Sequence, residues 1–147
     1  MLAKLTTDHK GAIAEAEIAA AAIRLGVGVS KPLSPRRYDL IFDVGTRLMR
    51  VQCKWGTRIG SVIVVRCRSC RRGPNGFIYR DYGCDEIDAI AAYCADVDCC
   101  YLFPVEQFDL RSAIQVRLEP SLNNQQTGIN WSDDFSFAAK LRPLLGP

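Results

Sequence analysis

A hairpin-like segment of the chain brings together three polar side chains of the types that bind a metal ion and a phosphate. Its two arms run from Tyr38 to Gly45 and from Arg50 to Trp55. If the arms pair antiparallel across a tight turn at Gly45 and Thr46, Asp39 lies opposite Gln52 and Lys54 lies one diagonal step away on the same face. A carboxylate, an amide oxygen and an ammonium then converge where a divalent cation and a phosphate could be held.

A fourth candidate, Glu15, lies on a helix predicted from Thr6 or Thr7 to about Leu25, with Gly26 after its end. A helical wheel places Glu15 in the middle of an apolar stripe, where a carboxylate is costly unless a partner or a metal meets it. The alternative is a carboxylate favoured by the helix dipole near the helix start. The place of Glu15 on the apolar face favours a functional role over this alternative. The stripe contains Ala12, Ile18, Ala19, Ala22, Ile23 and Leu25, whereas Lys10, Ile13, Glu17 and Arg24 fall on the other side.

Positive charge is concentrated in the middle of the chain. Residues 31–80 contain twelve Lys and Arg but only Asp39 and Asp43 as acids, a net charge of +10, against −7 for the remainder. This segregation predicts one face that attracts a polyanion, although a solvated basic face without a ligand is the alternative. The candidate phosphate contacts are Arg36, Arg37, Arg58, Arg66, Arg68, Arg71 and Arg72.

The seven cysteines allow a second hypothesis. Cys67, Cys70 and Cys84 could supply three zinc ligands, and Cys94, Cys99 or Cys100 a fourth, but a second Cys-x-x-Cys pair is missing. We favour the view that Cys53, Cys94, Cys99 and Cys100 are small hydrophobic residues in apolar elements.

Length and composition favour one globular domain over residues 1–147. No apolar run is long enough to span a membrane, and the N-terminus lacks the pattern of a secretory signal. We therefore expect a soluble cytoplasmic protein, in the nucleoid if its polyanion is DNA.

The remaining pattern predicts an α/β fold in which α-helices flank a central mixed β-sheet, in the order α-β-β-β-α-β. Residues 66–76 are interpreted as a basic loop with turn residues, and 121–128 as a polar loop. Beside the first helix and the hairpin, we predict strands near 27–30, 61–67, 77–82, 99–103 and 113–118 (the last at an edge), helices over 85–93 and 132–145, and a helical turn at 105–108.

Three short motifs, in this order and spacing, resemble the PD-(D/E)XK nuclease superfamily: Lys10-Gly11-x-x-x-Glu15, Tyr38-Asp39 and Gln52-x-Lys54. The similarity is greatest to a small bacterial endonuclease branch, itself similar to group I intron homing endonucleases and archaeal Holliday junction resolvases. Residues 85–93 and 100–104 resemble the second helix and the fourth core strand of that branch. The resemblance implies a restriction-endonuclease-like core over about residues 8–108, followed by a C-terminal extension over 109–147.

The resemblance also implies roles for the site residues. Asp39 would be the main carboxylate ligand of Mg²⁺ or Mn²⁺, joined by Glu15, the Gln52 side-chain oxygen and the Cys53 carbonyl. Lys54 would contact the attacking water or a phosphate oxygen. The chain departs from the family pattern in having Tyr38 before Asp39 instead of proline, and Gln52 instead of an acid, which removes one negative charge from the metal site.

These expectations describe a metal-dependent endonuclease that hydrolyses DNA and acts as a homodimer or higher homo-oligomer, since two strands need two sites. Two alternatives remain at this point. One is a DNA-binding module with a nuclease fold and weak or no cleavage, because of Gln52. The other is a zinc-stabilised interaction domain based on Cys67, Cys70 and Cys84.

Overall fold

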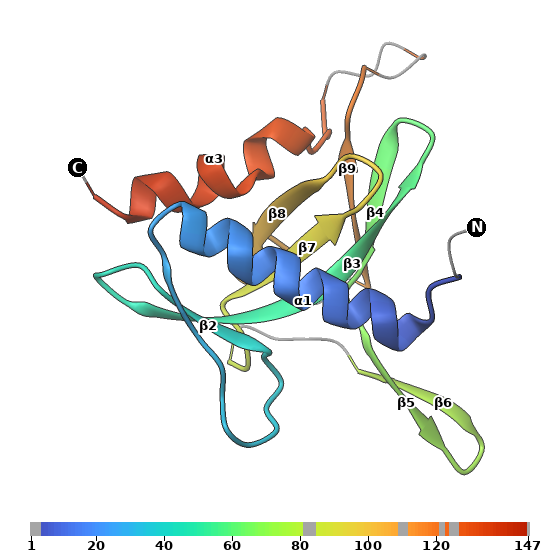
Figure 1. Ribbon diagram of the computed structural model, residues 1–147. Coiled ribbons are helices and arrows are strands. Elements are labelled where there is room, and N and C mark those ends of the chain that lie inside the picture. The colour runs from blue at the N-terminus through green and yellow to red at the C-terminus, as the bar shows by residue number, and fades with distance from the viewer. Residues whose placement is uncertain (1–3, 81–84, 109–111, 121–122, 124–126, 147) are drawn as a thin grey trace.

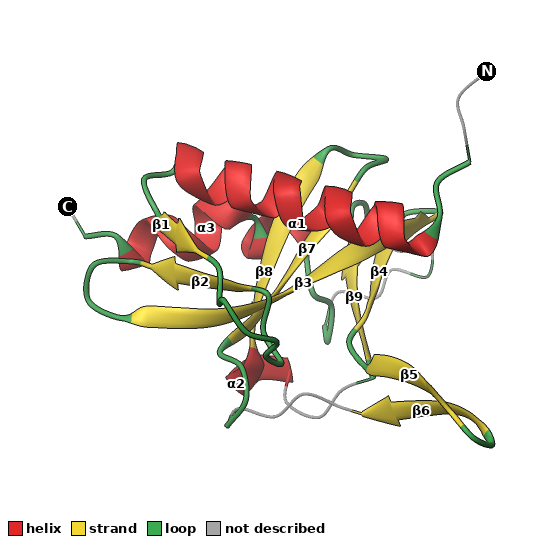
Figure 2. Cartoon of the chain, turned by 60° about the horizontal axis from the view of Figure 1, so that its bottom comes forward, coloured by secondary structure: helices red, strands yellow, loops and turns green. Residues whose placement is uncertain are grey.

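A mixed β-sheet with helices on both sides forms the body of the protein, seen here in a computed structural model (Figures 1 and 2). The structure describes residues 4–80, 85–108, 112–120, 123 and 127–146, without the side chains of 69–72 and 77–80. The main sheet has the order β1-β2-β3-β4-β9, with β7 also paired to β3 and β8 paired to β7. The strands are β1 (Gly28–Ser30), β2 (Leu40–Asp43), β3 (Leu48–Ile59), β4 (Val62–Arg66), β5 (Ser69–Gly73), β6 (Gly76–Arg80), β7 (Ala89–Cys94), β8 (Cys99–Pro104) and β9 (Ala113–Arg117). The helices are α1 (Thr7–Arg24), α2 (Val105–Phe108) and α3 (Phe137–Leu141), with 3₁₀ turns η1 (Ser132–Phe135) and η2 (Arg142–Leu144).

Helix α1 begins and ends where the sequence predicts. The Thr6 hydroxyl accepts a hydrogen bond from the His9 amide (3.2 Å), and the His9 imidazole accepts one from the Thr6 amide (3.4 Å). Gly26, after the helix, has a φ of +92°, which favours glycine. The wheel is wrong for Ile23, which is 59% exposed, because the stripe that is fully buried follows Ala14, Ile18 and Ala22 instead.

The hairpin of β2 and β3 has the predicted register. Leu40 pairs with Val51 and Asp43 with Leu48. The Gly45 amide donates to the Asp43 carboxylate (2.8 Å), and Gly45 has a φ of +90°, so the turn residues match the turn. The first part of β3 lies between β2 and β7, and its last four residues pair with β4.

The helix predicted over 85–93 is wrong. Strand β7 takes most of this segment and runs parallel to β3, with all six of its residues buried. A central strand covered on both faces is apolar throughout, so the spacing of Ile87, Ile90 and Ala91 also fits a helix and does not decide between the two. The predicted order is corrected at this element, whereas the mixed sheet with flanking helices is confirmed.

Two apolar cores lie on opposite faces of the sheet. Helices α1 and α3 cover one core, to which Phe137 and Leu141 contribute (Figure 1). Helix α2 and η1 close the other, where Phe103 lies 5.5 Å from Phe108 and 5.4 Å from Phe135 between ring centroids (Figure 2). The single last helix predicted over 132–145 is wrong, because the chain forms η1, α3 and η2 there, with Ser136 capping α3.

A separate two-stranded hairpin, β5 and β6, projects from the body (Figure 2). It replaces most of the basic loop predicted over 66–76, with Pro74 and Asn75 at its turn. None of the helices in the described ranges is long and apolar enough to cross a membrane.

Candidate active site

Asp39 lies immediately before β2 and is held against β3 through both its backbone and its side chain. Its amide donates to the Val51 carbonyl (2.9 Å), and its carboxylate Oδ2 accepts from the Cys53 amide (2.9 Å). These two bonds fix Asp39 beside Gln52, the residue between its two partners. Burial raises the pKa of the Asp39 carboxyl, and the negative charge of Glu15 raises it further, although the Cys53 hydrogen bond opposes the shift.

Lys54 is half-buried on β3, and its ammonium donates to the backbone carbonyl of Arg68 (3.3 Å). Burial lowers the pKa of Lys54, while the nearby charge of Asp39 acts in the opposite direction. Asp39 therefore has a carboxylate on one side, Glu15, and an ammonium on the other, Lys54, both close enough to alter its ionisation.

Glu15 forms an ion pair with Lys31, which the sequence analysis did not assign to the site. The hydrogen bond from Lys31 to Glu15 raises the pKa of Lys31, and Asp39 contributes in the same direction. Lys31 also lines two hollows. One, of about 440 Å³, has Glu15 and Leu40 in its wall, and the other, of about 360 Å³, has Asp39 in its wall. The signal that could have identified Lys31 is its place at the start of the basic segment, where the chain leaves β1.

Gln52 and Cys53 occupy alternate faces of β3. The side chain of Cys53 packs against the core under α1, so Gln52 and Lys54 are directed to the opposite face. Burial raises the pKa of the Cys53 thiol, which keeps it protonated and leaves its carbonyl as the candidate ligand. The charges of Glu15, on α1, and of Lys54 both act on Asp39, and Gln52 shares the face of Lys54.

Glu15, Asp39 and Gln52 provide the oxygen atoms that a hard divalent cation prefers. Within the described ranges, no group of three or more His, Cys, Asp or Glu is placed to hold a metal. Two carboxylates, one of them half-buried, still repel each other without a cation. The donor set fits a divalent ion whose shell is completed by an amide oxygen, a backbone carbonyl and water.

The arginines predicted to contact phosphate are spread over several elements. Arg36, Arg66 and Arg68 are exposed, and the Arg68 backbone lies at Lys54. Arg58 is exposed at the far end of β3, where its Nε donates to the Gly60 carbonyl (2.8 Å). That end of the sheet points away from the loop that leads to Asp39 (Figures 1 and 2). The side chains of Arg71 and Arg72 lie outside the described residues.

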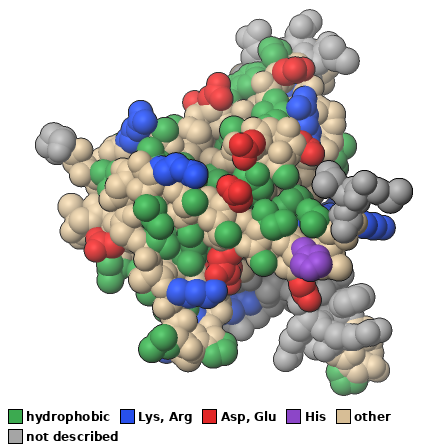
Figure 3. All heavy atoms as spheres, viewed as in Figure 1, with side chains coloured by type: hydrophobic (Ala, Val, Ile, Leu, Met, Phe, Trp, Pro, Cys, Tyr) green, Lys and Arg blue, Asp and Glu red, His purple; other side chains and the backbone are tan. Residues whose placement is uncertain are grey.

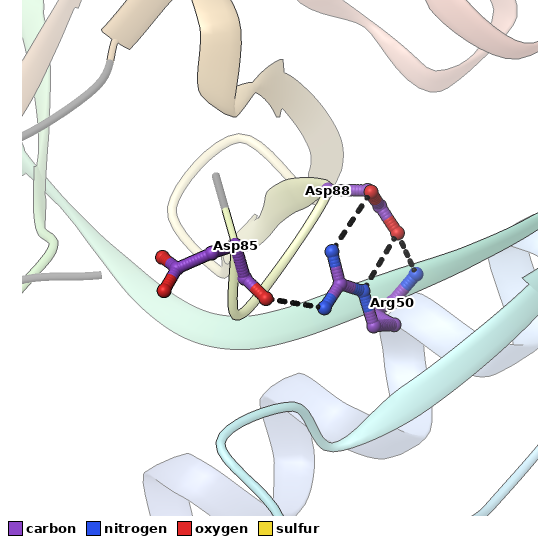
Figure 4. A network of polar contacts seen from close by, with 3 residues as sticks. All are labelled: Arg50, Asp85 and Asp88. Atoms are coloured by element: carbon purple, nitrogen blue, oxygen red, sulfur yellow. Dashed lines mark hydrogen bonds and ion pairs between the residues drawn. The ribbon is translucent and has the colours of Figure 1, made fainter. Parts of the chain in front are cut away.

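Two acidic residues before β7, Glu86 and Asp88, bind arginines of the basic segment, and the sequence analysis assigned no role to either. Asp88 accepts from the Arg50 amide (2.7 Å) and from its Nε (3.1 Å) and Nη2 (3.3 Å), while Arg50 Nη1 donates to the Asp85 carbonyl (2.8 Å) (Figure 4). Glu86 forms a largely buried ion pair with Arg37 (2.5 Å). Arg37, predicted as a phosphate contact, is therefore engaged with a carboxylate in this structure.

The face covered by α1 and α3 mixes acidic and basic side chains and has no continuous basic patch (Figure 3). The concentration of positive charge in residues 31–80 is therefore not a property of this face. This observation favours the strands and loops away from the two helices as the surface for a polyanion.

The zinc hypothesis finds no support among the described residues. Cys67 is buried, and its thiol contacts the Val65 carbonyl, while the side chain of Cys70 and the whole of Cys84 lie outside the described residues. Cys94 is buried and Cys53 and Cys100 are half-buried, as expected for small apolar residues, but Cys99 is exposed, which corrects that prediction.

Comparison with known proteins agrees with this geometry. The sequence model of the PD-(D/E)XK endonuclease family matches residues 5–138. The chain belongs to this family. The fold is also similar to a solved structure described as that of a bacterial homing endonuclease, I-Ssp6803I, with 28% identity and a TM-score of 0.74 over 96% of this chain and 94% of the other. No curated protein matches the chain.

Membership of the family confirms the predicted resemblance and establishes the protein as an endonuclease. Divalent metal ions are used generally by PD-(D/E)XK nucleases, and DNA is the substrate that the family implies. The family match continues well beyond residue 108, where the sequence resemblance ended, and includes Phe137 of the core under α1. Phe137 and Leu141, near the C-terminus, pack in the same core as Leu40, the residue after Asp39.

Proposed function

We propose that the protein is a Mg²⁺- or Mn²⁺-dependent endonuclease that cleaves DNA phosphodiester bonds at the site around Asp39. The observation that carries this proposal is the half-buried Asp39 carboxylate, held by the Cys53 amide and influenced by Glu15 and Lys54 at once. A structural aspartate on a solvated turn needs none of these neighbours.

Asp39 and Glu15 are the proposed carboxylate ligands of the cation, and the Gln52 amide oxygen and the Cys53 carbonyl are the proposed neutral ones. A bound divalent cation would stabilise negative charge on the phosphate and increase the acidity of a bound water. The Cys53 amide fixes one Asp39 oxygen, which leaves the other for the cation. Gln52 in place of a third acid lowers the negative charge of the site, so higher metal concentrations are needed for occupancy.

Lys54 has a separate role. Its half-buried ammonium donates to the Arg68 carbonyl (3.3 Å), and in the proposed complex it turns toward a phosphate oxygen. There it offsets charge that develops as the phosphorus–oxygen bond breaks, or orients the attacking water. The lowered pKa of Lys54, caused by burial, makes exchange of a proton with that water easier than for an exposed lysine.

DNA reaches this site over the loops that contain Lys31 and Arg36 and over Arg66 and Arg68. Their contacts with phosphates position the duplex and make binding dependent on salt, without reading sequence. Cleavage of both strands needs two sites, so we propose that the active form is a homodimer or higher homo-oligomer in the cytoplasm, associated with the nucleoid.

Nicking of supercoiled plasmid in Mg²⁺ or Mn²⁺ tests this proposal. The wild type should nick and then linearise the plasmid, whereas Asp39→Asn and Lys54→Ala should each lower the rate by about 10²-fold or more. Asp43→Asn is the matched control, because Asp43 lies at the other end of β2 and the one hydrogen bond described for its side chain is with the Gly45 amide in its own turn. Retained binding without any metal-dependent cleavage in the wild type would refute catalysis and favour a DNA-binding module with a nuclease fold.

A further inference from the structure

The loop between β1 and β2, residues 31–38, presents a leucine that the fold does not use. Leu33 has a relative exposure of 107%, and the other large hydrophobic side chains that the structure describes as exposed range from 37% to 64%. The loop projects beyond the sheet and lies on the same side of the molecule as the β5–β6 hairpin (Figures 1 and 2). No core contact explains a leucine at this position.

The backbone around Leu33 is restricted before anything binds. Pro32 and Pro35 have fixed φ angles, and each also restricts the residue before it, Lys31 and Ser34. Leu33 is therefore surrounded by four residues of limited freedom. Its side chain can be inserted into a partner with less loss of conformational entropy than one on a flexible loop.

The surroundings of Leu33 identify nucleic acid as the partner. Lys31 and Arg36 flank it, and residues 31–36 contain no acid. The same loop lines the hollow of about 360 Å³, and Asp39 at the end of the loop completes the lining. A phosphate positioned at Asp39 therefore brings its neighbouring bases to this loop, where two cations can contact the flanking phosphates.

We propose that Leu33 is an apolar wedge that enters the base stack of bound DNA beside the phosphate to be cleaved. This inference rests on the proposed function, because that function places the phosphate at Asp39. Leucine is among the side chains that DNA-bending proteins insert between base steps, which partly unstacks them and kinks the duplex. A kink at this point turns the backbone outward and exposes one phosphate to the site.

The first experiment measures unstacking without cleavage. A set of duplexes with 2-aminopurine at successive positions is mixed with the full-length protein in Ca²⁺, and fluorescence is recorded, since this base brightens when it is unstacked. We expect one position to brighten with the wild type and with Leu33→Met, and to stay dark with Leu33→Ala. Leu48→Ala is the matched control, because Leu48 is 64% exposed on the β2–β3 hairpin and should brighten the base like the wild type.

The second experiment measures cleavage in Mg²⁺ or Mn²⁺. Leu33→Ala should slow cleavage of a fully paired duplex by about tenfold, the lower end of what burial of one leucine side chain contributes. A mismatch at the brightened position, which is unstacked in advance, should restore most of the rate.

Three outcomes overturn the wedge. Equal fluorescence for the wild type and Leu33→Ala, or equal slowing on paired and mismatched DNA, shows that Leu33 does not enter the stack. A change in oligomeric state on gel filtration with Leu33→Ala assigns the leucine to a contact between copies of the chain. Unstacking by a wild type that never cleaves refutes the proposed function and leaves the wedge intact, so the two failures are distinguishable.

Discussion

Removal of the Asp88 carboxylate should destabilise the fold far more than removal of its neighbour Asp85. Asp88 stands directly before β7 and bonds the Arg50 amide and guanidinium, so it connects the central strand β7 to β3 through a charged group. Asp85 reaches Arg50 only through its backbone carbonyl, and its side chain points away from the guanidinium (Figure 4). Substitution of Asp85 by alanine therefore keeps the contact.

The expected magnitude follows from the two interactions of the Asp88 carboxylate that alanine cannot make. The hydrogen bond from the Arg50 amide to a carboxylate is worth about 2 kcal/mol, as a bond to a charged group. The ion pair with the guanidinium is about one third exposed on either side (35% and 28%), so it adds no more than about 1 kcal/mol. Asp88→Ala should thus cost about 3 kcal/mol and lower Tm by roughly 6–12 °C for a chain of this size. Asp88→Asn, whose amide oxygen can still accept from the Arg50 amide, should cost about half as much.

Chemical denaturation of Asp88→Ala, Asp88→Asn and Asp85→Ala, monitored by circular dichroism between pH 3 and pH 7, measures these costs. Burial acts to raise the pKa of Asp88, but the hydrogen bonds from Arg50 outweigh it and hold the pKa below its ordinary value. The Asp88 contribution should therefore be complete above about pH 4, the value for an unfolded aspartate, and disappear as pH falls through its lower folded pKa. If Asp88→Ala and Asp85→Ala lower the free energy of unfolding at pH 7 by amounts that differ by less than about 0.5 kcal/mol, the network does not stabilise the fold.

Three further predictions concern the charges of the site. Burial raises the pKa of Asp39, so its ionised form lowers the stability of the fold above that pKa. Asp39→Asn should therefore raise Tm at pH 7 and have no such effect below about pH 4, where the carboxyl is protonated in both states. An unchanged Tm at pH 7 would contradict this. Lys31→Met removes the cation paired with Glu15, and should strengthen Mn²⁺ binding by about tenfold in calorimetric titration, whereas unchanged affinity would show that Lys31 does not compete with the metal. Gln52→Glu adds a carboxylate ligand and should lower the Mg²⁺ concentration for half-maximal cleavage by about tenfold, unless Gln52 lies outside the metal shell, in which case that concentration stays the same.

The local elements with strong signals were predictable from sequence. Thr6, Gly26 and Gly45 fix a helix start, a helix end and a turn through backbone geometry that depends on these residues alone. The hairpin register followed from the turn, and the register in turn predicted that Asp39 lies beside Gln52. The pairing is local in sequence, so no long-range information was needed.

The elements that failed depend on contacts far apart in sequence. Strand β7 is defined by its parallel pairing with β3, and an apolar run with Ile87 and Ile90 gives no information about that partner. The ion pairs of Arg37 with Glu86 and of Glu15 with Lys31 are also set by the assembled fold. The residue types of Glu15 and Arg37 suggested functional roles, but the sequence did not predict which residues they pair with.

The pairing of Glu15 with Lys31 also gives a reason for Gln52 at the place of a third acid. Without a metal, the carboxylates of Glu15 and Asp39 face the ammonium groups of Lys31 and Lys54, so the charges of the four side chains cancel. A glutamate at position 52 would add an unbalanced negative charge next to a half-buried Asp39, whose pKa is already raised. With glutamine there, the four charges stay balanced without a cation, and if Glu15 binds the cation as proposed, Lys31, whose side chain is 67% exposed, would separate from it into solvent. On this view the weaker metal affinity that glutamine brings is offset by a lysine that leaves easily, since its charge is solvated as soon as it separates.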